Sequence, residues 1–345
     1  MPVFELLAIL AMAFGLSFAL CGGGLALGRL RQSEALGRSL VPAMVLLVAA
    51  LGWLLLRGRL DVIGEDVPDV VLNHIWTPFG AFGSLDVMMA SIAGIGLVAL
   101  LWTAVIGRRG AGGAKGRASR SGAKAKGAKT AADPDGRGSV WAISLIGLAM
   151  CWLVPAFGRP SWSPLEDGLS SALIWGGGVV AFLITHGALR RRLEPSSGSE
   201  KSQVAVLFAG AMGVFGLALV ADQSDLMALR NAILLWLVVC LGPLLWSWAG
   251  AVNPRPGLPA LLAASMVLPA QLMIFSLPTA LPACVVLLMC PFAVGPAHRA
   301  AMRLRRGKAG QAGAVTVVLS VIMAALPIAP ALALALVGGG IPVAW

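Results

Sequence analysis

Few side chains in this sequence are suited to catalysis or metal binding, and those few stand far apart. The three histidines, His74, His186 and His298, lie far apart in the sequence, and none stands at a spacing typical of metal ligands. The five cysteines lie inside apolar runs, where a thiol behaves as a small apolar side chain. The sequence also lacks a GxSxG elbow and a GxxxxGK[ST] phosphate loop. We therefore predict no catalytic residue, no metal site and no cofactor.

Ionisable groups inside a membrane are costly, so they are functional candidates by default. Glu5 and Asp86 are the only acids that touch a predicted apolar helix, and all bases lie in loops or at helix ends. Asp86 opens its helix, where the N-terminal dipole stabilises a carboxylate. A sodium or proton pump needs a relay of such groups through the membrane. We therefore expect that this chain alone is not a complete ion-translocating unit.

The composition indicates which class of protein, and so which kind of secondary structure, holds these polar residues. Hydrophobic residues make up 58% of the 345 residues and charged residues only 12%, with a mean hydropathy of +0.88. A soluble domain has roughly 25% charged residues, and a disordered chain has low hydrophobicity, so both classes are excluded. The remaining class is an all-α polytopic membrane protein.

A helix that crosses a bilayer needs about 20 apolar residues. Prolines in the last three candidate segments predict kinked or broken helices there. The sequence predicts ten membrane helices, at residues 5–28, 40–56, 86–107, 139–157, 169–188, 204–221, 231–250, 257–277, 279–296 and 313–337.

The loops between these segments carry a strongly uneven charge. Lys and Arg favour the cytoplasmic side of short loops. Alternate loops on one side contain all but four of the 26 bases, the exceptions being Arg57, Arg59, Arg159 and Arg230. The formal net charge of +11 thus separates into +17 on one side and −6 on the other. We expect both termini on the outer side, and the positive charge does not indicate nucleic acid.

Three parts follow along the chain. Residues 1–107 form a three-helix membrane part, residues 108–138 a flexible basic cytoplasmic linker, and residues 139–345 a seven-helix membrane part. The Gly/Ala/Lys-rich linker has almost no large apolar residue, so it fixes topology as a solvated tether or binds anionic lipid headgroups or an acidic partner. Three glycines at 176–178 favour close helix packing, with a backbone ligand site as the alternative.

Residues 67–100 carry a more specific pattern. Asn and Ile precede two Phe residues, a hydroxyl–Leu pair and an apolar helix that contains Ile-Ala-Gly-Ile-Gly. This segment resembles the C-terminal stretch of the large subunit of Mrp-type multisubunit sodium/proton antiporters and a small subunit of membrane-bound hydrogenases. A weaker resemblance to the following small Mrp subunit covers residues 139–250. The matching positions are Asn73, Ile75, Phe79, Phe82, Ser84, Leu85 and residues 92–96.

The chain departs from that family at three charged positions. The family has Arg, Asp and Glu where this sequence has Gly80, Gly83 and Val87, and Asp86 lies one residue from the Glu position. The resemblance implies an accessory subunit that lines an access path for sodium or protons beside a partner with the ionisable relay. The polar residues expected at the entrance of that path are Asn73, His74, Ser84 and Asp86.

The expected function is therefore that of an accessory membrane subunit of a cation/proton antiporter or a related hydrogenase-like respiratory complex in the bacterial inner membrane. Its expected partners are other membrane subunits, sodium or protons, and anionic lipid headgroups at the basic loops. The alternative is a self-contained transporter or permease for an uncharged or lipidic solute, which uses the proline-broken helices at 257–337. An enzyme acting on lipid-linked substrates is a third possibility, disfavoured because no acid/base or metal constellation is present.

Overall fold

The computed structural model describes residues 3–30, 168–191, 200–249, 258–304 and 312–339, together with Gly52, Met88, Met89 and Ile92. These residues are helical or lie in short turns, and no strand occurs among them. In chain order the elements are α1 (Val3–Leu30), α6 (Gly168–Arg191), α7 (Glu200–Gln223), α8 (Met227–Trp248), α9 (Leu258–Ser276), the 3-10 helix η2 (Pro278–Ala280), α10 (Leu281–Leu288), the 3-10 helix η3 (Cys290–Ala293), α11 (Val294–Leu304), α12 (Ala312–Ala325) and α13 (Ile328–Gly339).

Five stretches of the described helices are long and apolar enough to cross a membrane, so the chain has the character of an all-helical membrane protein. They are Phe4–Ala26, Val204–Gln223, Met227–Trp248, Pro278–Ala301 and Val315–Val337. Large apolar side chains such as Phe4, Met12 and Ile322 are exposed on them, as expected for surfaces that face lipid. The predicted segments 40–56, 86–107 and 139–157 lie outside the described residues except for the four single residues named above, and the total of ten remains a prediction.

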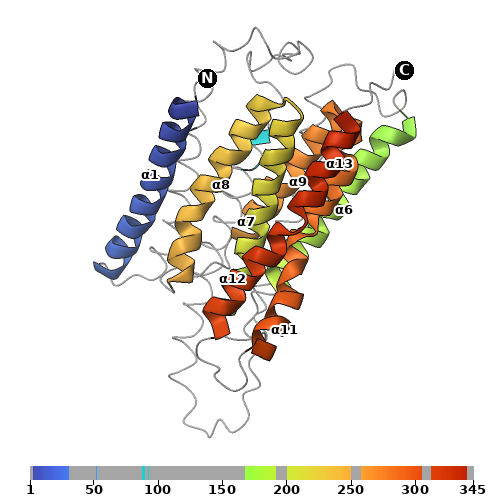
Figure 1. Cartoon of the computed structure of the whole chain (residues 1–345). Helices are drawn as coiled ribbons and strands as arrows, with labels where there is room; N and C mark the ends of the chain where they lie inside the picture. Colours follow the sequence, from blue (N-terminus) through green and yellow to red (C-terminus); the bar gives the residue numbers. More distant parts are fainter. Residues whose placement is uncertain are drawn as a thin grey trace, which may run out of the picture.

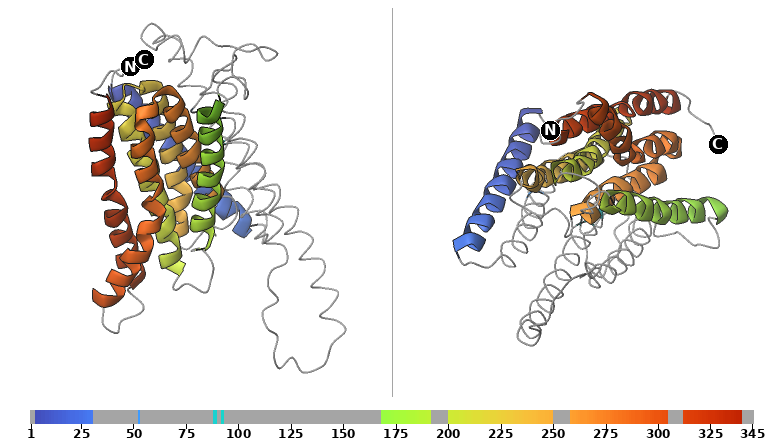
Figure 2. Two further views of the ribbon diagram at one scale, coloured as in Figure 1. Left: turned by 90° about the vertical axis from the view of Figure 1, so that its right-hand side faces the viewer. Right: turned by 90° about the horizontal axis from the view of Figure 1, so that it is seen from below.

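The helices pack side by side in an elongated bundle (Figures 1 and 2). α7 lies inside it and packs against α8, α9 and α12. The first turn of α1 and the last turn of α13 lie at the same end of the bundle, which is also the end at which α7 passes into α8 (Figures 1 and 2). We call this the α7–α8 end, and the opposite end, where α11 finishes and α12 begins, the α11 end.

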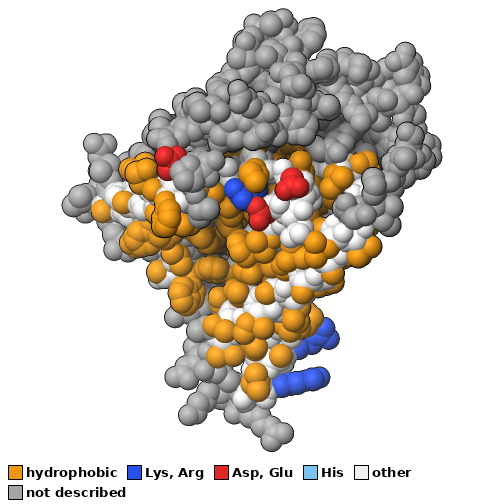
Figure 3. Space-filling view, turned by 45° about the horizontal axis from the view of Figure 1, so that its top comes forward, with side chains coloured by type: hydrophobic (Ala, Val, Ile, Leu, Met, Phe, Trp, Pro, Cys, Tyr) orange, Lys and Arg blue, Asp and Glu red, His pale blue; other side chains and the backbone are white. Residues whose placement is uncertain are grey.

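Charge separates along the bundle axis. Figure 3 shows an apolar band between one end with acidic side chains and a single neighbouring base, near the α7–α8 turn, and the α11 end, where the coloured charged side chains are basic. The described Asp, Glu, Lys and Arg residues all lie within about two turns of a helix end or in a turn. This distribution matches the charge pattern of the predicted loops for the part of the chain that the structure describes.

The last third of the chain contains the broken helices that its prolines predict. The expected helix at 279–296 is divided into η2, α10, η3 and α11, with Pro291 in η3. The expected helix at 313–337 ends at Ala325 and resumes at Ile328, because Pro327 lacks the N–H that would continue α12. Pro269, by contrast, lies inside a continuous α9.

α8 begins four residues earlier than the sequence predicted. Leu226 donates its N–H to the Ala221 carbonyl over 2.9 Å and Asp225 donates to Asp222 over 3.2 Å, and Asp225 has φ of 58°. This is a Schellman ending of α7, with Asp225 in the left-handed conformation that glycine usually occupies. α8 starts at Met227, two residues after Asp225, so Arg230 lies inside the first turns of α8 and not in a loop.

Small residues set the closest helix contacts. Gly178, the last of the three glycines in α6, faces Gln271 of α9, and a Cβ at Gly178 would lie 1.6 Å from Gln271 Nε2. Gly176 and Gly177 face open space. In the bundle centre, a Cβ at Gly213 of α7 would lie 3.2 Å from the Leu287 carbonyl oxygen of α10. The prediction of close helix packing at 176–178 is therefore confirmed at Gly178.

α1 and α8 run parallel and share a polar contact inside their interface. Pro243 lies within α8 and supplies no N–H to the Val239 carbonyl four residues earlier. The Ser17 hydroxyl of α1 donates to that carbonyl over 2.7 Å. Nearby, the Trp246 indole stacks on Phe18 and donates its Nε1–H to the Phe18 carbonyl over 3.0 Å. α1 thus provides a donor for the backbone group that the proline leaves open.

Candidate functional site

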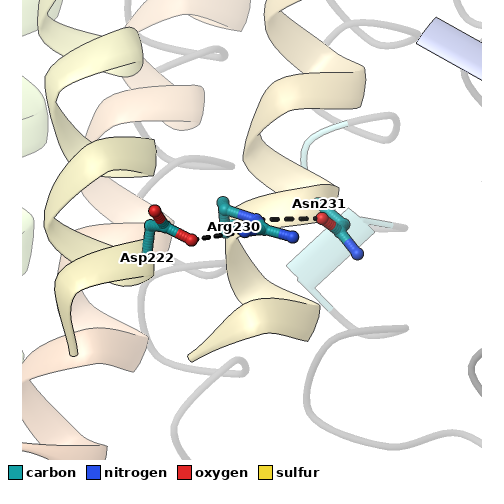
Figure 4. Close-up of polar contacts among 3 residues, drawn as sticks. All are labelled: Asp222, Arg230 and Asn231. Carbon is teal, nitrogen blue, oxygen red and sulfur yellow. Dashed lines mark hydrogen bonds and ion pairs between the residues drawn. The ribbon is translucent and has the colours of Figure 1, made fainter. Parts of the chain in front are cut away.

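A polar cluster occupies the α7–α8 end of the bundle. Asp222 comes from the last turn of α7, and Arg230 and Asn231 come from the first turns of α8. Figure 4 shows the Arg230 guanidinium between the Asp222 carboxylate and the Asn231 amide. Arg230 Nη1 pairs with Asp222 Oδ1, and Arg230 Nε donates to Asn231 Oδ1 over 3.1 Å. We call these three residues the rim cluster.

The rim cluster combines an accessible ion pair with a buried amide. The Asp222 side chain is 50% exposed and the Arg230 side chain 25%, whereas Asn231 is buried. The short turn of residues 224–226 reverses the chain direction and places the start of α8 beside the end of α7, which brings Asp222 next to Arg230.

The helix dipoles give both Asp222 and Arg230 a reason to pair with an opposite charge. A carboxylate at a helix C-terminus and a cation at a helix N-terminus each lie at the unfavourable end of the dipole. Asp222 and Arg230 occupy those two positions and neutralise each other. Asp225, in the turn, leaves the described charge at this end negative. The net negative charge at this end favours cations over anions electrostatically.

α8 also contacts the predicted second and third membrane segments just below this cluster. Leu235 lies one turn along α8 from Asn231, and a Cβ at Gly52 of segment 40–56 would lie 2.8 Å from Leu235 Cδ1. Trp236 Nε1 donates to the Met89 sulfur of segment 86–107 over 2.7 Å. Met88, Met89 and Ile92 are buried against the core. The described residues of segment 86–107 therefore pack beside the helix that carries Arg230 and Asn231.

The four residues predicted for the path entrance, Asn73, His74, Ser84 and Asp86, lie outside the described residues. The other two histidines lie away from the rim cluster. His186 is buried and stacks on Phe182 within α6, and His298 lies on α11. In the described ranges no group of three or more His, Cys, Asp or Glu residues is arranged to hold a metal ion.

Sequence reasoning did not single out the rim cluster. Arg230 was one of four bases on the less basic side, and Asn231 was the first residue of a predicted helix. A signal was nonetheless present, since Asp222 and Arg230 flank a three-residue connection between two apolar helices. Two residues so placed on antiparallel helices must come close together at the turn.

A second polar contact joins the two broken helices. The Cys290 thiol, at the start of η3, lies 3.3 Å from the Ala324 carbonyl at the end of α12. The break at Pro291 therefore lies beside the break at Pro327. Both breaks adjoin α7, where Gly216 is close to Leu287 and Ile328.

Comparison of the chain with protein-family models, with curated proteins and with solved structures gives no match.

Proposed function

We propose that this chain is an accessory membrane subunit of a multisubunit cation/proton antiporter or a related hydrogenase-like respiratory complex. The observation that carries the proposal is the Trp236–Met89 contact, which joins segment 86–107 to the helix that also contributes Arg230 and Asn231. In this proposal the rim cluster and Asn73, His74, Ser84 and Asp86 form one polar entrance on the outer side. A partner subunit supplies the relay through the membrane.

The charge distribution supports a polar entrance on this chain and an ion relay on a partner subunit. Acidic groups are in excess over bases at the α7–α8 end in the described part of the chain, and a net negative surface raises the local concentration of cations. The described spans keep their Asp, Glu, Lys and Arg residues near their ends, which is why the proposal assigns the relay through the membrane to a partner subunit. We further propose ten membrane helices, both termini outside, and a place in the bacterial inner membrane, on the basis of the loop charges.

Growth under sodium or alkaline stress tests the proposal in cells. Asp86→Ala and Asp222→Asn should each impair growth without lowering the amount of chain in the membrane. Asp133→Asn, which removes one carboxylate from the predicted inner linker, is the matched control and should grow normally. Normal growth of both entrance variants at normal protein levels would overturn the proposal.

The adjacent helix breaks favour a second candidate, a self-contained transporter for an uncharged or lipidic solute. Many transporters form their substrate site from discontinuous helices near the bilayer midplane, where exposed backbone dipoles replace charged side chains. The Cys290–Ala324 contact brings two such breaks together. Solute uptake into proteoliposomes that contain only this chain would support this candidate over the subunit proposal.

A further inference from the structure

An exposed apolar stripe runs along α10 and η3. Leu281, Val285, Met289 and Phe292 are all exposed, and their spacing of four, four and three residues places them on one helical face. Pro278–Ala301 as a whole is apolar enough to cross a membrane. The stripe therefore faces the hydrocarbon of the bilayer along the span Pro278–Ala301.

The same face ends in two arginines on α11. Arg299 follows Phe292 by seven residues and Arg303 follows Arg299 by four, so both continue the stripe, and both are exposed. The opposite face of α11 is buried through Val294, Ala297 and Ala301, and α11 packs against α12. That packing holds the two arginines on the outer surface. Figure 3 shows basic side chains projecting at the α11 end.

The lengths match one leaflet of a bilayer. Ten residues separate Met289 from Arg299, four in η3 at about 2.0 Å each and six in α11 at about 1.5 Å each, which gives about 17 Å. This is slightly more than half of the roughly 30 Å hydrocarbon core. The guanidinium groups therefore reach headgroup depth when Met289 lies near the midplane. Neither α11 nor α12 contains an acidic residue that would neutralise them.

We propose that this face binds one anionic phospholipid, whose phosphodiester lies between Arg299 and Arg303 and whose acyl chain lies along the apolar stripe. Guanidinium groups form paired, charge-assisted hydrogen bonds with phosphate oxygens. Basic residues at the end of a membrane helix attract anionic lipid. The site is independent of the proposed function, because it lies at the opposite end of the bundle from the rim cluster.

Native mass spectrometry of the delipidated full chain tests the site, with phosphatidylglycerol and phosphatidylcholine of identical acyl chains as probes. We expect phosphatidylglycerol to bind more tightly, and Arg299→Gln/Arg303→Gln to weaken its binding about thirtyfold, since each base near an anionic surface contributes about 1 kcal/mol. Arg57→Gln/Arg59→Gln removes the same charge from a predicted outer loop and should leave binding unchanged. Equal binding of the two lipids, or unaltered binding by the Arg299/Arg303 variant, would overturn the proposal.

Two further arms separate a lipid from other phosphate sources and guard against misfolding. Glycerol phosphate, which has the headgroup without acyl chains, should compete at least tenfold more weakly than phosphatidylglycerol. Equal competition would show a site for free phosphate and would contradict the proposal. If the double variant does not fold, Arg303→Gln alone replaces it, and this exposed change at the end of α11 should weaken phosphatidylglycerol binding about fivefold. Unchanged binding by this single variant would also count against the site.

Discussion

The Ser17 hydroxyl of α1 donates a hydrogen bond to the Val239 carbonyl of α8 over 2.7 Å, at the carbonyl from which Pro243 has removed the helical donor. An unpaired carbonyl in an apolar interior costs roughly 1–3 kcal/mol, so this bond offsets most of the penalty of the proline. It joins two helices 222 residues apart in sequence. Gly242 lets α1 come close, because a Cβ there would lie 2.6 Å from Ser17 Oγ.

Ser17→Ala should destabilise the chain by about 1–2 kcal/mol, measured by unfolding in mixed detergent micelles. The cost should fall towards zero in a Pro243→Ala background, because residue 243 then donates to Val239 in the ordinary helical way. Ser265→Ala is the control. Ser265 is also buried, but it donates to Leu261 of its own helix over 2.7 Å, and that carbonyl has a helical donor as well. An equal cost of Ser17→Ala in both backgrounds would contradict this account.

Gly178→Ala should weaken the packing of α6 on α9, since the new methyl would occupy the space of the Gln271 amide. Such overpacking typically costs about 1–3 kcal/mol. Gly177→Ala, one residue away, meets nothing within 4 Å and should be neutral or slightly stabilising, because Ala favours helix. Thermal unfolding of the two variants in detergent distinguishes them, and similar melting temperatures would show that α6 does not approach α9 in this way.

Asp225→Gly should stabilise the chain by about 0.5–1 kcal/mol, because φ of 58° places Asp225 in the left-handed region that glycine adopts without a Cβ penalty. Asp225→Val should destabilise it, since a β-branched residue is strained there. Asp225→Asn should be close to neutral. In denaturant unfolding, the free energy of unfolding should be highest with Gly at position 225, intermediate with Asn or Asp and lowest with Val. A Val variant as stable as wild type would be incompatible with this turn.

Asp222→Asn should cost at most about 1 kcal/mol of stability, because the ion pair is half-exposed and screened by water. The effect should shrink as salt is raised, since exposed charge interactions are screened over about 10 Å at 0.1 M salt. Exchange of the two residues, Asp222→Arg with Arg230→Asp, places each charge at the favourable helix end and should restore stability. A loss of several kcal/mol in the single variant would mean that the pair is buried.

The helices of the described ranges were predictable, because long uncharged apolar runs have few alternatives to a membrane helix. Their breaks were predictable from Pro291 and Pro327. Close packing at glycines 176–178 was predictable, but not that Gly178 would be the one that makes the contact. The contacts of Ser17 and Arg230 were not predictable, because a membrane helix is apolar on all sides and its sequence gives no sign of which face is buried. The predicted entrance residues Asn73, His74, Ser84 and Asp86 lie outside the described ranges and remain predictions.

The composition of the native assembly tests the subunit proposal most directly. The full chain, purified at its natural level from its own membranes in mild detergent, should appear by native mass spectrometry in a stoichiometric complex. That complex should include a membrane subunit with acidic or basic residues in the middle of its spans, and Asp222→Asn should slow its sodium or proton transport. A monodisperse single chain, or a complex whose transport Asp222→Asn and Asp86→Ala leave unchanged, would contradict the proposal.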